Sequence, residues 1–105
     1  MTNITLGRLI EWLNTLPTSK RIKHGFGTGD SYRGYYEQLA FEPEDDTTIG
    51  EMLASAQFAL GREYQGYKGG EFMMSSYTEV WIGSYGTTCD SSAITEHTLK
   101  LWEAQ

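Results

Sequence analysis

The sequence predicts an α+β fold, a mostly antiparallel β-sheet with two main helices packed on one face, as a single domain over residues 1–105. Two segments repeat apolar residues at helical spacing, and several others alternate apolar with polar residues as strands do. The composition, 39% hydrophobic and 21% charged, is that of a globular chain. At 105 residues the chain has room for one small core.

The first helix is expected over residues 5–16. Its apolar residues recur three or four positions apart on one face: Leu6, Leu9, Ile10, Leu13 and Leu16. Thr5 is a suitable N-cap, and Pro17 should end the helix because the residue before a proline avoids the helical region. Trp12 lies at the edge of the apolar face, so we expect it to be a core aromatic.

Two strands are expected next, at residues 20–26 and 35–42. Ile22 and Phe26 alternate with charged or small residues in the first, and the second is rich in aromatic residues. Pro43 is expected to close the second strand or to mark a sheet edge. Residues 44–47 should form an acidic turn. We expect regular structure to be interrupted by three glycines: Gly25, Gly27 and Gly29.

The second helix is expected to begin after Thr48, which forms a capping-box pattern with Glu51. Gly61 stands at the usual terminating position. The acidic residues before the helix favour the positive end of its dipole, so we do not predict a metal site there. One apolar face is formed by Ile49, Met52, Leu53, Ala56, Ala59 and Leu60.

The C-terminal third is expected to form a three-stranded meander. Strands are predicted at residues 71–75 and 78–84, joined by a hairpin turn at residues 75–77. A final strand is predicted within residues 93–102, because the apolar and polar residues alternate there; a helix is the alternative.

Charge and cysteine content exclude several classes of function. The net charge of −6 argues against non-specific binding to duplex nucleic acid, which depends on phosphate neutralisation by Lys and Arg. Cys89 is the only cysteine, so neither an intramolecular disulfide nor a zinc site with paired cysteines is expected. No signal-peptide pattern and no apolar run of about 18 residues occurs. We therefore expect no membrane association and a cytoplasmic location.

No pattern in the sequence identifies an enzyme, and we predict no catalytic residue, metal or cofactor. His24 and His97 lie far apart in the sequence and form no metal-binding pattern. Cys89 and His97 have the chemistry of a thiolate pair, but nothing in the sequence enforces their approach. The Gly-Lys-Ser/Thr phosphate-binding loop is absent.

Two segments, residues 32–35 and residues 67–70, instead combine an aromatic ring, a cation and glycine. This combination suits a nucleotide-like small molecule. The ring would stack on a base, the cation would meet a phosphate, and bare backbone N–H groups would bind oxygen atoms. The alternative is that the glycines only shape turns and the tyrosines pack on the helices. With one further segment and a tryptophan, the predicted ligand-binding residues are Tyr32, Arg33, Gly34, Tyr67, Lys68, Gly69, Gly70, Trp81, Tyr85 and Thr87.

Four blocks of the sequence resemble a family of small, mostly uncharacterised bacteriophage proteins. They are SYRGYYEQLAFEP at 31–43, TIGEML at 48–53, GYKGGEF at 66–72 and VWIGSYG at 80–86. Small phage proteins of this size often counter host defence. By analogy with the sponges that sequester cyclic nucleotide signals of Thoeris or CBASS systems, the resemblance implies an anti-defence role in the host cytoplasm.

The leading hypothesis is therefore a non-enzymatic phage protein that binds and sequesters a nucleotide-like signal. Because 105 residues leave little room to enclose a ligand, we expect a homo-oligomer with pockets at its interface. One alternative is an uncharacterised phage structural or regulatory protein. Another is an acidic inhibitor of a host defence nuclease, of the anti-CRISPR or anti-restriction type, that binds through Glu37, Glu42, Glu44, Asp45 and Asp46.

Overall fold

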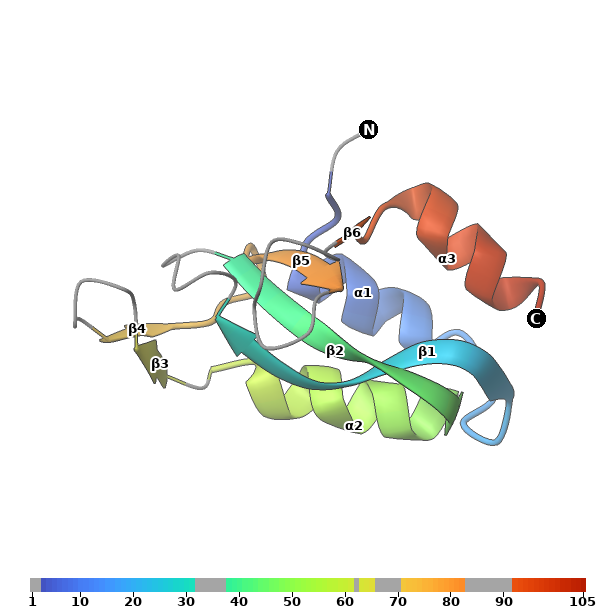
Figure 1. Ribbon diagram of the computed structural model, residues 1–105. Coiled ribbons are helices and arrows are strands. Elements are labelled where there is room, and N and C mark those ends of the chain that lie inside the picture. Colours follow the sequence, from blue (N-terminus) through green and yellow to red (C-terminus); the bar gives the residue numbers. More distant parts are fainter. Residues whose placement is uncertain (1–2, 32–37, 62, 66–70, 83–91) are drawn as a thin grey trace.

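The computed structural model describes residues 3–31, 38–61, 63–65, 71–82 and 92–105. The predicted α+β class is confirmed (Figure 1). In chain order the elements are α1 (Leu6–Leu13), β1 (Arg21–Ser31), β2 (Gln38–Thr48), α2 (Ile49–Ala59), β3 (Glu63–Gln65), β4 (Glu71–Met73), β5 (Glu79–Ile82), β6 (Ser92–Ala93) and α3 (Glu96–Glu103).

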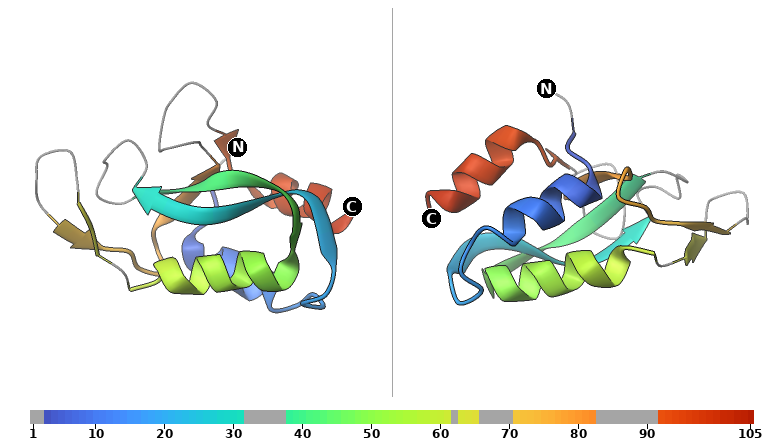
Figure 2. Two further views of the ribbon diagram at one scale, coloured as in Figure 1. Left: turned by 60° about the horizontal axis from the view of Figure 1, so that its bottom comes forward. Right: turned by 180° about the vertical axis from the view of Figure 1, so that it is seen from behind.

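The main sheet has the strand order β1-β2-β5-β6, and β3 and β4 form a separate two-stranded sheet. The β1–β2 and β5–β6 pairs are antiparallel, whereas β2 and β5 are parallel, so the sheet is mostly antiparallel as predicted. Helix α2 packs along β1 and β2, and α1 packs beside α2 on the same side of the sheet (Figure 2). This arrangement confirms the prediction of two helices on one face.

The β1–β2 ladder is the longest pairing in the sheet and extends beyond both predicted strands. It runs from the Arg21–Thr48 pair to the Ser31–Leu39 pair, with a register shift between Phe26 and Gly29. The predicted break at the three glycines is wrong, because all three lie within β1. The predicted acidic turn at residues 44–47 is also wrong, because these residues continue β2.

Gly25 lies in the middle of β1, at a position where the packing leaves no room for a side chain. A Cβ atom at this position would lie 2.6 Å from Cγ2 of Thr47 and 2.9 Å from Sδ of Met52. Distances this short do not occur for real Cβ atoms, so the glycine permits the close approach of the strand to α2. Its role is packing, and it does not end the strand.

Pro43 lies on a part of β2 that has only one neighbouring strand. It pairs with Phe26 of β1, whereas β5 pairs with β2 only from Gln38 to Phe41. A proline has no N–H to donate, so it is tolerated where no strand follows on its other side. The expectation that Pro43 marks an edge is confirmed, but β2 continues past it to Thr48.

The helix boundaries follow local signals in the sequence. Thr5 caps α1 by accepting a hydrogen bond from the N–H of Arg8, and Thr48 caps α2 by accepting one from the N–H of Glu51 at 3.1 Å. The carboxylate of Glu51 accepts from the hydroxyl of Thr47 at 2.9 Å. Gly61, with φ of +80°, follows α2 as predicted, while α1 ends at Leu13, before the expected position.

The prediction for the C-terminal third is largely wrong. Strand β4 pairs with β3, and β5 pairs with β2 and β6, so residues 71–82 do not form the expected hairpin. The final predicted strand is instead helix α3, which was the alternative. Its N-terminus is a capping box formed by Thr95 and Thr98, and its buried residues, Leu99 and Trp102, are three positions apart.

An aromatic cluster joins α1 and α3 to the sheet. The ring of Phe26 lies 4.3 Å from that of Phe41 and 5.6 Å from that of Trp102, between ring centroids. Trp12 lies 5.9 Å from Trp102 and is only 4% exposed, which confirms its prediction as a core aromatic. Its indole N–H donates to the carboxylate of Glu103. Such ring pairs stabilise a core beyond the area that they bury.

Arg8 links α1 to α3 on the surface. Its Nε donates to Oε2 of Glu96 at 2.8 Å and its Nη2 to Oε1 at 2.9 Å, a paired arrangement that holds both groups in one geometry. The hydrogen bond from Arg8 lowers the pKa of Glu96, and the same bond raises the pKa of Arg8. None of the helices described is long and apolar enough to cross a membrane.

Replacing Gly25 by alanine should destabilise the protein by about 1–3 kcal/mol, because the new methyl group would overlap Thr47 and Met52. Gly27→Ala is the matched control on the same strand. Its new Cβ would meet the carboxylate end of Glu44, an exposed side chain that can rotate away, so we expect a loss below about 1 kcal/mol. Urea unfolding of both variants measures the difference, and equal losses would contradict this packing role for Gly25.

The Arg8–Glu96 pair should contribute stability that depends on pH. Because the pKa of Glu96 is lowered in the folded protein, the contribution is present above the ordinary glutamate pKa of about 4.3 and is lost as the pH falls through the lowered value. We expect Glu96→Gln to be slightly less stable than the wild type near about pH 7 and equal to it below about pH 3. Urea unfolding at both pH values, with Glu96→Gln in an Arg8→Gln background as the control, tests this.

Candidate functional site

Nine of the ten predicted ligand-binding residues lie outside the described residues. They are Tyr32, Arg33, Gly34, Tyr67, Lys68, Gly69, Gly70, Tyr85 and Thr87. The tenth, Trp81, is half-buried on β5, opposite Ala40 of β2 and Ala93 of β6. Trp81 therefore lies in the interior of the main sheet rather than at its margin.

The strand ends that border two of the predicted segments lie at the same end of the molecule. Strand β1 ends at Ser31 and β2 begins at Gln38, on either side of residues 32–37. Strand β3 ends at Gln65 and β4 begins at Glu71, on either side of residues 66–70. Strands β1 and β3 are in contact, and the views in Figures 1 and 2 place these ends together.

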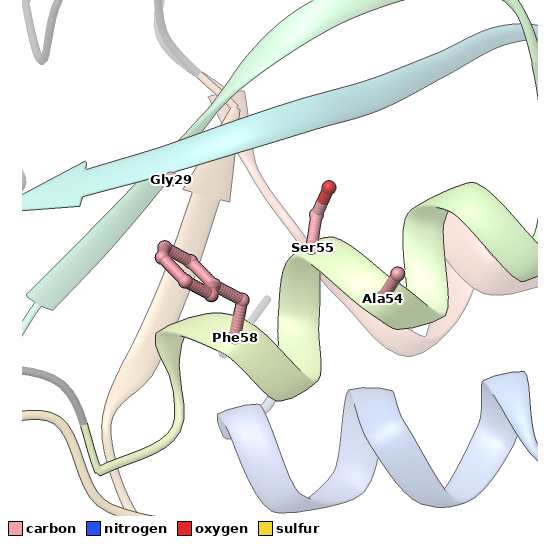
Figure 3. Close-up of a pocket in the computed structure, with 4 residues that line it drawn as sticks. All are labelled: Gly29, Ala54, Ser55 and Phe58. Atoms are coloured by element: carbon pink, nitrogen blue, oxygen red, sulfur yellow. The ribbon is translucent and has the colours of Figure 1, made fainter.

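A hollow of about 320 Å³ lies between this end of β1 and helix α2 (Figure 3). It is lined by Gly29 of β1 and by Ala54, Ser55 and Phe58 of α2, and the side chains of Ser55 and Phe58 point from the helix toward the strand. Its volume is at the lower end of the range of small-molecule sites, about 300–1,000 Å³. Its lining combines an aromatic ring, a hydroxyl group and a half-buried glycine.

The sequence analysis assigned none of the four lining residues to a site, and Phe58 is the one that a sequence signal could have found. Its side chain is 63% exposed, because α2 buries its opposite face through Ile49, Met52, Ala56 and Ala59. Phe58 follows Glu51 and Ser55 at helical spacing, on the polar side of α2. A large aromatic residue on the polar side of an amphipathic helix is the signal that would have indicated this site.

The lining of the hollow carries no charge. None of the four lining residues is charged, and Glu51, one turn earlier on α2, is exposed. A phosphate group would therefore need cations from elsewhere in the chain. Arg33 and Lys68, the predicted phosphate-binding residues, belong to the two segments whose borders lie at this end of the molecule.

A second surface is formed by consecutive acidic residues near the end of β2. Glu44, Asp45 and Asp46 are all exposed, and Oδ1 of Asp45 lies 3.0 Å from Nδ1 of His24. Asp46 has φ of +55°, a left-handed conformation that aspartate tolerates better than most residues. Of the rest of the predicted acidic face, Glu42 is half-buried and Glu37 lies outside the described residues.

Within the described ranges, no three His, Cys, Asp or Glu side chains lie close enough together to hold a metal ion. Comparison of the chain with protein-family models, with curated proteins and with solved structures found no match. The resemblance to small phage proteins therefore stays a prediction, and the function has to be argued from the residues alone.

Proposed function

We propose that this chain is a non-enzymatic phage protein that binds a nucleotide-like small molecule and withholds it from a host defence system. The observation that carries the proposal is the hollow beside Phe58, which lies at the end of β1 that leads directly into Tyr32, Arg33 and Gly34. The borders of the segment with Tyr67 to Gly70 lie at the same end.

Each residue type has a defined role in this proposal. The exposed ring of Phe58 offers a face on which a base stacks, a contact worth about 1–3 kcal/mol per base. Arg33 and Lys68 supply positive charge, which none of the four lining residues carries, and glycine N–H groups bind phosphate oxygens. A second copy of the chain would complete the enclosure of a ligand larger than one hollow.

Isothermal titration calorimetry with cyclic dinucleotides, cyclic trinucleotides and cyclic ADP-ribose isomers tests this function. We expect one of these ligands to bind at micromolar concentration, and the double variant Arg33→Ala, Lys68→Ala to weaken it at least about 10-fold, because two charge-assisted contacts are lost. The control is Arg21→Ala with Lys100→Ala, which removes the same charge from exposed positions on β1 and α3. Absence of binding, or equal affinity in both double variants, would contradict the proposal.

An acidic inhibitor of a host defence nuclease is the second candidate, and the exposed row Glu44, Asp45 and Asp46 favours it. Three consecutive exposed carboxylates offer concentrated negative charge to a basic groove. Binding through such a surface weakens steeply with salt, because exposed charges are screened over about 10 Å at 0.1 M ionic strength.

This candidate predicts that a pull-down from a bacterial lysate captures a basic nuclease that is released as salt rises from about 0.05 to 0.5 M. The variant Glu44→Gln, Asp46→Asn should lose the complex, and it leaves the Asp45–His24 contact in place. The control variant Glu11→Gln, Glu96→Gln changes the net charge by the same amount, but at exposed positions on α1 and α3, and it should retain the complex. A complex that survives in the first variant, or one that resists salt, would rule out this surface.

A further inference from the structure

Ser55 is the polar member of the four residues that line the hollow between β1 and α2. The other three, Gly29, Ala54 and Phe58, have no side-chain hydrogen-bond donor or acceptor. The side chain of Ser55 points from the helix toward the strand, into the space between them (Figure 3). Ser55 is half-buried whereas Ala54 and Phe58 are exposed, so it stands further inside the hollow than they do.

The hydroxyl group of Ser55 forms no hydrogen bond within the part of the chain that the structure describes. A serine inside a helix commonly donates to the carbonyl oxygen four residues earlier or points into solvent. The threonines that precede α2 behave differently, because Thr47 donates to the carboxylate of Glu51 at 2.9 Å and Thr48 accepts from its N–H at 3.1 Å. The Ser55 hydroxyl is therefore the polar group that the hollow can offer to a ligand.

Alanine at position 55 would suit the helix better than serine does. Alanine has the highest helix propensity, and serine is less favourable because its hydroxyl competes for backbone groups. Ser55 stands between Ala54 and Ala56, so alanine is accommodated on both sides of it. A serine that neither caps the helix nor bonds to the described residues lowers stability, which is common for residues of a binding site.

The hollow has the size of one base and carries no charge. Its volume of about 320 Å³ is that of about ten water molecules at about 30 Å³ each, and a nucleobase has about ten non-hydrogen atoms. Because none of the four lining residues is charged, the phosphates of a nucleotide should stay outside. A base that enters in this way presents the edge opposite its sugar, the Watson–Crick edge, to the inside of the hollow.

We infer that Ser55 determines which ligand is bound, because its hydroxyl hydrogen-bonds to the Watson–Crick edge of one base while the ring of Phe58 contacts the face of that base. The two side chains are three positions apart on α2, so one base can meet both. Proteins read an isolated base through stacking and hydrogen bonds to this edge. The inference rests on the proposed function, which supplies the class of ligand, and adds the group that distinguishes a base from an apolar ring of the same shape.

NMR titration with two nucleosides of the same shape tests this role. Adenosine has a donor and an acceptor on its Watson–Crick edge, whereas benzimidazole riboside has the same bicyclic outline and the same sugar but only C–H groups on that edge. We expect Ser55→Ala to weaken adenosine binding by about 3–10-fold, the effect of losing one hydrogen bond. The affinity for benzimidazole riboside should change by less than about 2-fold, since it has no partner for the hydroxyl. Ser55→Thr, which restores a hydroxyl, should recover the affinity for adenosine.

Gln57→Ala is the matched control on the same helix. Gln57 is exposed and is not one of the four lining residues, so this variant should bind both nucleosides as the wild type does. Urea unfolding provides the second control. Ser55→Ala should be at least as stable as the wild type, because alanine is the better helix former, and weaker binding of adenosine is then not a result of unfolding.

Three results would overturn the inference. If adenosine binds the wild type and Ser55→Ala equally, or binds neither at millimolar concentration, no base edge meets this hydroxyl. If Ser55→Ala weakens both nucleosides to the same extent, Ser55 acts through the shape of the hollow. If Ser55→Ala is less stable than the wild type, the hydroxyl has a structural role.

The outcomes for the proposed function are distinguishable from these. If adenosine binds through Ser55 but no cyclic nucleotide binds at micromolar concentration, the hollow reads a base and the sequestration of a nucleotide signal is wrong. If a cyclic nucleotide binds the wild type and Ser55→Ala with equal affinity, the proposed function holds and the role of Ser55 is wrong.

Discussion

The packing of the Phe26 ring is the interaction on which the rest of the structure depends. The ring is fully buried, stacks on Phe41 across the β1–β2 ladder, and contacts Trp102 of α3, which in turn contacts Trp12 of α1. One side chain thus joins the longest ladder of the sheet to two helices. The register shift that follows Phe26 separates the half of β1 beside α3 from the half that lines the hollow.

This division gives β1 two roles. Its first half is held between β2, α2 and α3, where Gly25 permits close packing and the backbone N–H groups of Lys23 and His24 are hydrogen-bonded. Its second half, from Gly29, faces the exposed side of α2 and leads toward the predicted ligand-binding segments. Stability and the proposed binding function therefore lie in different parts of one strand, and they can be changed separately by mutation.

The sequence was sufficient to predict an element where the interactions that determine it are local. The caps at Thr5 and Thr48, the terminating Gly61 and the apolar faces of the first two helices all act within a few residues, and these elements were predicted. Leu60 is the exception, because it is 43% exposed although it was assigned to the core face. It follows the last helical residue, where the helical spacing no longer fixes its direction.

Prediction failed where the controlling partner is distant in the sequence. From the sequence alone Gly25 predicts the end of a strand, and only its contact with Met52 of α2 shows its packing role. The pairing of β5 with β2 rather than with β4 depends on the whole sheet. Residues 93–102 satisfy both a strand and a helix pattern, and the capping box at Thr95 selects the helix. Phe58 was overlooked as a site residue although its position on the polar side of α2 was visible in the sequence.

The central claim is that the hollow between β1 and α2 receives the base of a nucleotide-like ligand. NMR spectra of isotope-labelled protein, recorded during titration with a cyclic dinucleotide, test it most directly. The account predicts saturable shifts of the Gly29 and Ser55 amide signals and of the Phe58 ring signals, with the signals of Leu101 on α3 unchanged. Binding that leaves Gly29, Ser55 and Phe58 unchanged, or spectra that do not respond at all, would contradict it.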